Sequence, residues 1–303
     1  MTDDRLIAGI ELGGTKAIAV LGRAGEVVEQ RRVPTTTPHE TLAALSRCLR
    51  EWGADQPIAA LGIASFGPIR IDPAAPDFGT ILDTPKPGWR GADVAGILGS
   101  VVGCPFAIDT DVNGAALAEY HWGAGQGCDS LCYITIGTGV GGGLVVGGRP
   151  VHGALHPEIG HLRLRRAGGD TFEGACQFHD DCIEGLISGP ALAARFGGDP
   201  ALVAEADPRW LDVASDIAEL AAAMLLTVSA ERVLIGGGVG TGRALLLPLV
   251  RAVLQQKLGG YLPFLDAQSV QNIVCAPALG DTAGPLGAIA LGLTALDHFG
   301  RCD

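Results

Sequence analysis

Short apolar runs and glycine-bearing turns alternate along the first 34 residues of the chain. Residues 6–11, 17–21 and 27–33 are rich in aliphatic side chains, and glycines lie in the segments 12–16 and 22–25 between them. Runs of this length, bounded by glycines, predict three strands joined by hairpin turns. A strand follows the first glycine turn, whereas a Walker A loop or a Rossmann fingerprint needs a helix there, so neither motif is present.

The same plan recurs in the middle of the chain. Residues 131–136 and 142–146 are predicted strands, and residues 137–139 and 147–148 are predicted turns. Two copies of this unit predict a duplicated architecture, with one copy in each of two lobes.

Helical periodicity accounts for most of the remaining sequence. Predicted helices cover residues 40–52, 113–122, 211–231 and 283–297, and further predicted strands cover residues 232–235 and 272–276. The first two helices stop at Gly53 and Gly123, which are typical helix ends. Strands alternating with helices and hairpins predict an α/β fold with mixed sheets.

A chain of 303 residues is long enough for two lobes, and the boundary between them is predicted near residues 109–113. We expect a small N-terminal lobe of residues 1–110, completed by a C-terminal helix over 285–303, and a large lobe of residues 111–284. The sequence shows no disordered linker, so the lobes should pack directly with a central cleft between them.

Charge and cysteine usage limit the classes of partner and compartment. A net charge of −12 argues against nucleic acid or an anionic membrane as the main partner. The longest uncharged apolar stretch, near residues 283–296, is too short to span a bilayer, and the acidic N-terminus does not resemble a signal peptide. The eight cysteines do not form the dense framework of a small secreted domain. We therefore expect a cytoplasmic protein.

Three glycine clusters are candidates for phosphate binding. Hairpin turns at residues 13–16 and 137–139 combine glycines with a threonine, and a third cluster spans residues 236–238. Each one alone is more simply a tight turn. Together they favour a nucleotide site, because backbone N–H groups of such turns can bind phosphate oxygens.

Acidic residues end the apolar segment before the second predicted helix, at Asp109 and Asp111. One interpretation is helix capping, in which Asp111 or Asn113 accepts N–H groups of the first turn. The other makes Asp111 a general base that accepts a hydroxyl proton, since phosphoryl transfer asks little covalent work of the protein.

Two thiols and two imidazoles are concentrated in a loop over residues 156–184. Cys176, His179 and Cys182 have the spacing Cys-x-x-His-x-x-Cys, and His161 precedes them. This set predicts a tetrahedral zinc site, and four protein ligands leave no open position for catalysis, so the zinc should be structural. His161 also ends the unit Glu158-Ile-Gly-His161, so a zinc here would position Glu158 beside a substrate.

Other polar residues give weaker signals. The loop 84–89 is either plain structure or a wall of the cleft that offers Lys86 and Trp89. Surface or packing roles are expected for the histidines that lack a partner pattern: His39, His121, His152 and His298.

Taken together, these motifs resemble those of the ROK sugar kinases, within the actin/hexokinase-like ATPase superfamily. The matching stretches cover nearly the whole chain: residues 9–16, 109–116, 136–141, 156–161, 176–182, 235–239 and 278–281. Within the family, the chain is most similar to bacterial fructokinases, which share Thr84-Pro-Lys86, the Asp109-Thr-Asp-Val-Asn113 segment and the Cys-x-x-His-x-x-Cys spacing.

The resemblance implies a duplicated ribonuclease H-like fold and ATP-dependent phosphorylation of a hexose at its 6-hydroxyl. It makes Asp111 the catalytic base, with Thr110, Glu158 and His161 contacting the sugar and one imidazole nitrogen of His161 on zinc. It also implies Mg²⁺ on the phosphate oxygens, with Glu11 holding it through water, and a homodimer. The ATP-binding residues implied are Gly13, Gly14, Thr15, Lys16, Gly137, Thr138, Gly139, Gly236, Gly237 and Gly238.

Two departures from the family pattern matter, the first for the geometry on the metal side and the second for sugar specificity. Glu11 stands where the wider superfamily has an aspartate, and Thr110 stands where many family glucokinases have an asparagine, which favours fructose over glucose. The alternatives are a glucokinase, a mannokinase or a broad hexokinase. A sugar-responsive repressor is disfavoured, because the first strand begins within a few residues of Met1 and leaves no room for a helix-turn-helix domain.

Overall fold

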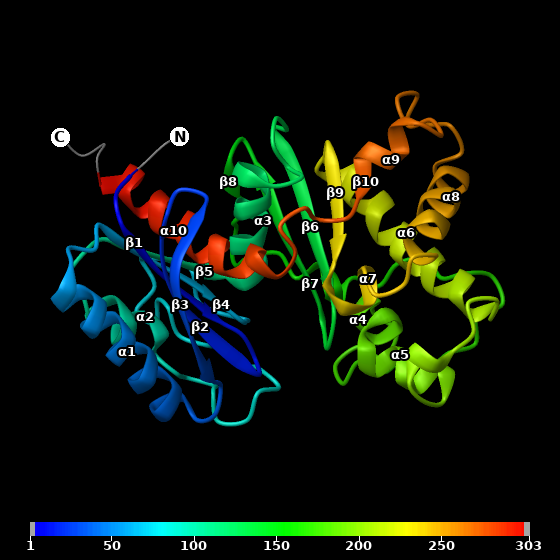
Figure 1. The fold of residues 1–303 in the computed structure, drawn as a ribbon. Coiled ribbons are helices and arrows are strands. Elements are labelled where there is room, and N and C mark those ends of the chain that lie inside the picture. The colour runs from blue at the N-terminus through cyan, green and yellow to red at the C-terminus, as the bar shows by residue number, and fades with distance from the viewer. Residues whose placement is uncertain (1–3, 300–303) are drawn as a thin grey trace. The chain divides into compact units, whose positions relative to one another are not determined.

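The chain divides into two units (Figure 1). The computed structural model describes residues 4–299, so the end of the predicted C-terminal helix, residues 300–303, lies outside the described residues. Unit 1 takes in the chain up to residue 126, the segment 149–156 and the chain from residue 279 onward. Unit 2 takes in residues 127–148 and 157–278.

The sheet of unit 1 has the order β3-β2-β1-β4-β5. Its strands are β1 (Ile7–Leu12), β2 (Lys16–Arg23), β3 (Glu26–Pro34), β4 (Ala60–Ser65) and β5 (Phe106–Thr110). The first three form the predicted antiparallel hairpins, and β1, β4 and β5 are parallel. In that register Leu12 lies opposite Ser65, and Ser65 lies opposite Thr110, so the carboxyl ends of the parallel strands meet at one edge of the sheet.

Helices cover both faces of this sheet (Figure 1). On one side are α3 (Asp111–Trp122) and α10 (Ala283–Phe299), and on the other are α1 (Pro38–Asp55) and α2 (Val94–Gly99). Alternate residues of β1, such as Ala8 and Ile10, join Leu45 and Trp52 of α1 in a core that excludes water. Gly62 of β4 allows α10 to approach closely, since a Cβ at this position would lie 1.9 Å from the carbonyl oxygen of Ala288.

The second sheet repeats the topology of the first, in the order β10-β9-β6-β7-β8. Its strands are β6 (Ser130–Ile136), β7 (Val140–Val146), β8 (Arg149–Pro150), β9 (Arg232–Gly236) and β10 (Val274–Cys275). β6 pairs antiparallel with β7 and parallel with β9, as β1 does with β2 and β4. The predicted duplication is confirmed.

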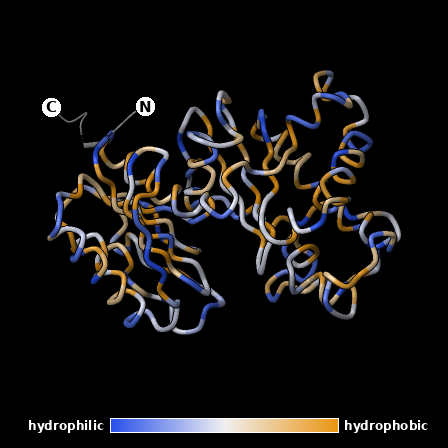
Figure 2. Tube along the Cα trace, in the orientation of Figure 1, coloured by the Kyte–Doolittle hydropathy of each residue, from blue (hydrophilic) through white to orange (hydrophobic). Residues whose placement is uncertain are grey.

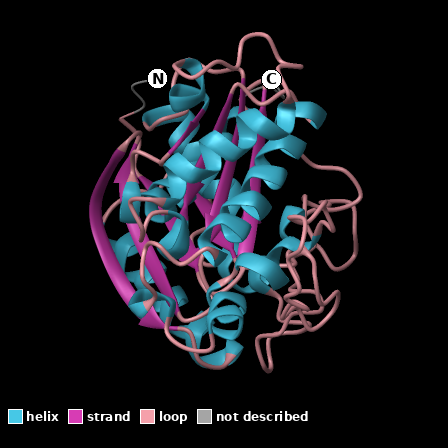
Figure 3. Cartoon of the chain, turned by 90° about the vertical axis from the view of Figure 1, so that its right-hand side faces the viewer, coloured by secondary structure: helices cyan, strands magenta, loops and turns pink. Residues whose placement is uncertain are grey.

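The two longest helices of unit 2, α6 (Arg209–Thr227) and α8 (Leu246–Leu258), pack on each other beside β9 (Figure 3). The shorter helices are α4 (Ile183–Ile187), α5 (Gly189–Phe196), α7 (Gly237–Gly240) and α9 (Ser269–Ile273). Single 3₁₀ turns are η1 (Ile159–His161), η2 (Pro200–Leu202) and, in unit 1, η3 (Gly280–Thr282).

Two predicted elements differ from the structure in length. The helix expected over 211–231 ends at Thr227, because the chain turns at Ser229, whose φ is 51°. The strand expected over 272–276 is only Val274–Cys275, because residues 269–273 form α9. Its apolar residues fit a short buried helix as well as a strand, which sequence periodicity alone does not distinguish.

Apolar residues are concentrated on the strands and on the inner sides of the helices (Figure 2). α10 has the most apolar composition of the long helices, and it packs on β1, β4 and β5. Within the described residues, every helix is either too short or too polar to cross a bilayer.

Candidate functional site

Hydrogen bonds to its carbonyl oxygens hold the first glycine turn, which lies between β1 and β2. The hydroxyl of Thr35 donates to Gly13 O at 2.8 Å, and its backbone N–H donates to Thr15 O at 3.1 Å. The ammonium of Lys86 donates to Gly14 O at 2.5 Å. Because these carbonyls are engaged by Thr35 and Lys86, the turn is fixed in a shape that can present N–H groups to an anion.

The loop 84–89 is a support for this turn. The ammonium of Lys86 also donates to Thr35 O at 3.1 Å, so it joins the turn to the end of β3. Trp89 is fully buried, and its indole N–H donates to Thr36 O at 2.9 Å. The interpretation of Trp89 as an exposed cleft wall is therefore wrong, whereas Lys86 brings a positive charge to the glycine turn.

Glu11 is the penultimate residue of β1, and its carboxylate packs against the start of α10. A Cβ on Gly284 would lie 2.3 Å from its Oε1, and Oε2 is buried without a hydrogen-bond partner among the described residues. Burial raises the pKa of Glu11, the Lys16 ammonium opposes this rise, and the Asp281 carboxylate adds to it. The unsatisfied oxygen of Glu11, with the Asp281 carboxylate within electrostatic reach, suits a hard cation such as Mg²⁺.

The junction between β5 and α3 carries Asp111. Thr110 is the N-cap of α3, and its side-chain oxygen accepts the N–H of Asn113 at 3.1 Å. The interpretation that Asp111 or Asn113 caps the helix is therefore wrong, because the buried Thr110 hydroxyl does so. Asp111 is the first residue of α3 and is half-buried, so its carboxylate lies at the positive end of the helix dipole.

The glycine segments of unit 2 converge at the end of β6. Gly137 N donates to Gly139 O at 2.9 Å in the predicted turn. Gly237 has a φ of 81°, and a Cβ there would lie 2.4 Å from Ile136 O, so the third cluster lies against the start of this turn. Residues 237–240 form the helical turn α7 instead of the expected loop.

Two acidic side chains lie near this turn. Glu184 of α4 accepts the N–H of Val140 at 3.0 Å through Oε2, and a Cβ on Gly139 would lie 2.7 Å from the same oxygen. Desolvation and the neighbouring Glu184 carboxylate raise the pKa of Glu158 to about 7. Two carboxylates beside a glycine turn can accept hydrogen bonds from several hydroxyls of a polar ligand.

The loop of the Cys/His cluster folds through backbone hydrogen bonds. Cys176 and Asp180 exchange both N–H···O bonds, at 3.1 and 2.9 Å, which brings His179 back toward Cys176. Asp180 takes a φ of 52°, a conformation that aspartate tolerates in such tight turns. Ile183 N donates to Leu162 O at 2.9 Å, and this bond places Cys182 next to His161.

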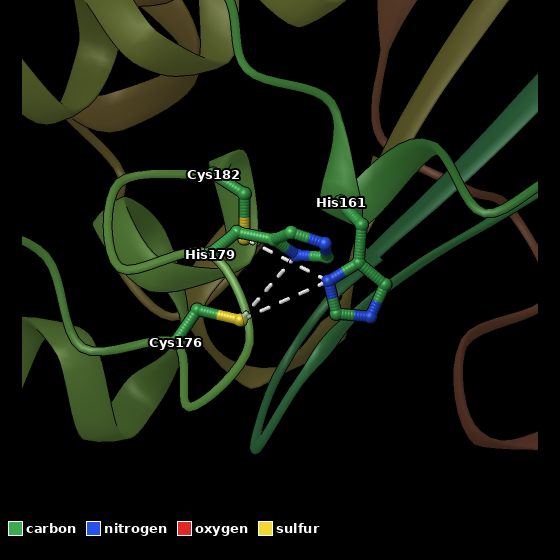
Figure 4. Close-up of side chains that lie close together, drawn as sticks. All are labelled: His161, Cys176, His179 and Cys182. Carbon is green, nitrogen blue, oxygen red and sulfur yellow. Dashed lines mark hydrogen bonds between the residues drawn. The ribbon is translucent and has the colours of Figure 1, made fainter. Parts of the chain in front are cut away.

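The four side chains of the cluster converge (Figure 4). Their ligand atoms all lie within 4.8 Å of one another, and the sulfurs of Cys176 and Cys182 lie 3.9 and 3.7 Å from His161 Nδ1. A tetrahedral zinc with ordinary bond lengths requires sulfur–nitrogen separations of about 3.6 Å. The donor set therefore fits zinc. His161 turns Nδ1 toward the thiols and its other nitrogen away from them (Figure 4).

A buried ion-pair network holds the loop between His161 and Cys176. Arg195 of α5 contacts Asp170 at 3.3 Å and Asp216 of α6 at 3.0 Å, and its side chain is 2% exposed. Arg166 also pairs with Asp170, at 2.8 Å. These contacts fix the loop to two helices of unit 2, so the Cys/His cluster is carried on a supported segment.

Sequence reasoning missed three residues that the structure brings to these sites. Glu184 gave no signal except its position two residues after Cys182. Asp109 is 2% exposed, and it accepts the side-chain N–H of Asn113 at 2.8 Å. A surface or packing role was expected for His152, because the sequence shows no partner pattern for it, but its Nε2 lies 2.8 Å from Asp109 Oδ2.

Comparisons with known proteins agree with this arrangement. A family model described as the ROK family matches residues 7–295. A fructokinase of Zymomonas mobilis is 39% identical over 97% of this chain and 99% of its own, and one of Pediococcus pentosaceus is 36% identical over 97% and 99%. The fold is similar to that of a ROK hexokinase from Thermus thermophilus, with a TM-score of 0.80, 27% identity and coverage of 97% of this chain and 99% of that one. A ROK glucokinase from Streptomyces griseus, solved with glucose and AMPPNP, has a TM-score of 0.71, 27% identity and coverage of 95% and 99%.

Proposed function

The chain belongs to the ROK family, and we propose that it is an ATP-dependent kinase that phosphorylates D-fructose at the 6-hydroxyl. The observation that carries the sugar assignment is the similarity to fructokinases over nearly the full length of the chain. The ATP dependence is supported by the ROK glucokinase of Streptomyces griseus, which was solved with the ATP analogue AMPPNP.

In this proposal the glycine segments bind ATP. Gly13, Gly14, Thr15 and Lys16 lie at the carboxyl edge of the parallel strands of unit 1, which is where ligands bind in open α/β sheets. Gly137, Thr138 and Gly139 take the equivalent position in unit 2, and Gly236, Gly237 and Gly238 lie beside them for the adenosine. The equivalence of the two turns in a duplicated fold supports a pair of phosphate contacts.

Asp111 is the proposed general base. Its carboxylate accepts the proton of the sugar 6-hydroxyl as the oxygen attacks the γ-phosphorus of ATP. The bond from this phosphorus to the β–γ bridging oxygen breaks, and ADP leaves with the electron pair. The hydrogen bond from Val112 N to Asp111 Oδ1, at 2.9 Å, orients the carboxylate.

Glu158 and His161 are the proposed sugar contacts, and Glu184 joins them on geometric grounds. Glu184 lies next to the glycine turn and within electrostatic reach of Glu158. Thr110 is buried as a helix cap, so its proposed influence on the sugar acts through the position of Asp111. The ring nitrogen of His161 that is turned away from the cluster (Figure 4) is the atom proposed to contact a sugar hydroxyl.

Two metals complete the proposal. Zinc held by His161, Cys176, His179 and Cys182 would stabilise the loop that carries the sugar contacts. Mg²⁺ near Glu11 would neutralise charge on the phosphate oxygens during transfer. The buried unsatisfied oxygen of Glu11 supports this second site, because it would accept a hydrogen bond from a water molecule bound to the magnesium.

We also propose a cytoplasmic homodimer that acts on small molecules, without nucleic acid or membrane partners. The free cysteines of the described residues support a reducing compartment. The net charge of −12 supports the absence of polyanionic partners. Light scattering after size-exclusion chromatography would distinguish the dimer from a monomer.

The decisive experiment is a steady-state panel of sugars with ATP. We expect kcat/KM to be highest for fructose among fructose, mannose, glucose and the N-acetylhexosamines, with fructose 6-phosphate as the product. A glucokinase, a mannokinase or a broad hexokinase is the alternative, and a higher value for glucose or mannose would establish it. Absence of phosphoryl transfer to every sugar would instead favour a non-catalytic, sugar-responsive protein.

A further inference from the structure

His152 belongs to a segment that is tied to unit 1 at two points. The chain leaves unit 2 at Gly148, contributes residues 149–156 to unit 1, and returns to unit 2 at Pro157. His152 Nε2 lies 2.8 Å from Asp109 Oδ2, and His156 Nε2 accepts the N–H of Ile69 at 3.2 Å. His156 is 5% exposed, so this end of the segment is fixed independently of His152.

Asp109 is the centre of the contacts at the β5–α3 junction. Its Oδ1 accepts the backbone N–H of Thr110 at 2.7 Å and the side-chain N–H of Asn113 at 2.8 Å. Its other oxygen faces His152. Asp111 lies between Thr110 and Asn113, so one carboxylate holds the backbone just before the proposed base and a side chain two residues after it.

The energetics of this carboxylate depend on His152. The Asp109 side chain is 3% exposed, and a buried carboxylate is costly unless donors surround it. The hydrogen bond to Asp109 raises the pKa of His152, and desolvation opposes this rise. Without the imidazole, Oδ2 would lose a charge-assisted hydrogen bond, and the junction would relax around the unsatisfied oxygen.

We propose that His152 is a positioning residue, which holds Asp109 and thereby fixes the orientation of Asp111 at the start of α3. The proposal rests on the function proposed above, in which Asp111 is the base. A small displacement of the base changes the rate of the chemical step more than it changes the affinity for substrate. The effect of losing His152 should therefore fall on kcat and leave both KM values nearly unchanged.

Replacement of His152 by glutamine or by asparagine tests the hydrogen bond to Asp109, because the two amide side chains differ in length. In His152→Gln the amide nitrogen can occupy the place of Nε2, whereas in His152→Asn it is one methylene too short. The His152 side chain is 42% exposed, so neither change leaves a buried cavity. His39→Asn, at an exposed position on α1, is the matched control.

We expect His152→Asn to lower kcat about tenfold or more, with KM for sugar and ATP changed less than about threefold. His152→Gln should recover kcat to within about threefold of wild type, because it restores the donor. The proposal is overturned if His152→Asn retains wild-type kcat, or if His152→Gln is as slow as His152→Asn.

A double-mutant cycle separates action through Asp109 from direct substrate contact. The effects of Asp109→Asn and His152→Asn on kcat and on the free energy of unfolding should be non-additive, because both changes remove the same interaction between Asp109 and His152. Additive effects in both measurements would overturn the proposal. If the wild-type protein phosphorylates no hexose, the proposed function fails, and the unfolding cycle alone then decides whether His152 acts through Asp109.

Discussion

Replacing Cys182 by serine should remove zinc and weaken sugar binding. The Cys182 side chain is fully buried, and its sulfur lies 3.7 Å from His161 Nδ1. A serine hydroxyl at this position would be a much weaker zinc ligand than the thiolate. Structural zinc contributes about 10–16 kcal/mol in small zinc domains, so one ligand of four corresponds to about 2.5–4 kcal/mol, or about 70- to 900-fold in affinity.

Metal analysis after dialysis against a chelator is the first assay. We expect about one zinc per chain in the wild type and far less than one in Cys182→Ser. KM for fructose should rise at least about tenfold, because His161 and Glu158 lose their support, while KM for ATP should change less. Cys104→Ser, at a half-buried cysteine of unit 1, is the matched control and should keep its zinc.

Two outcomes would refute this reasoning. A Cys182→Ser protein that retains one zinc would show that the cluster does not use this thiolate. Zinc-free protein with wild-type kcat/KM for fructose would show that the metal does not support the sugar contacts. A fall in melting temperature without a change in KM would restrict the zinc to a role in folding.

Three further results follow from the structure. Asp111→Asn should lower kcat by about 10²–10⁴-fold with KM nearly unchanged, and a kcat near wild type would contradict its role as the base. Gly62→Ala should lower the free energy of unfolding in urea by about 1–3 kcal/mol, because its Cβ would lie 1.9 Å from Ala288 O, and unchanged stability would contradict the packing of α10 on β4. Asp109 raises the folded-state pKa of His152 above its unfolded value of about 6.5, so the stabilisation by this pair is fully present below about pH 6.5 and is lost as pH rises through the raised pKa. The difference in unfolding free energy between wild type and His152→Asn should therefore narrow toward about pH 9, and a difference that widens would contradict the ion pair.

The local sequence determined the repeated units and the metal ligands. Short apolar runs bounded by glycines define β1, β2, β6 and β7, because strand pairing across a short turn depends on neighbouring residues. The Cys-x-x-His-x-x-Cys spacing likewise places Cys176 and His179 on one tight turn, with Cys182 just after it. Short elements were less predictable: α9 and β10 share one apolar run, and only packing decides where the helix ends.

The sequence by itself determined the duplicated α/β plan, the four-ligand cluster and the acidic segment at Asp111, because each depends on residues close together in the chain. The tertiary structure alone decided which side chains meet across long separations. It placed His152 on Asp109, Lys86 on the first glycine turn, and Glu184 on the second. These contacts join segments 43, 72 and 44 residues apart, and hydrophobic periodicity carries no information about pairings of that range.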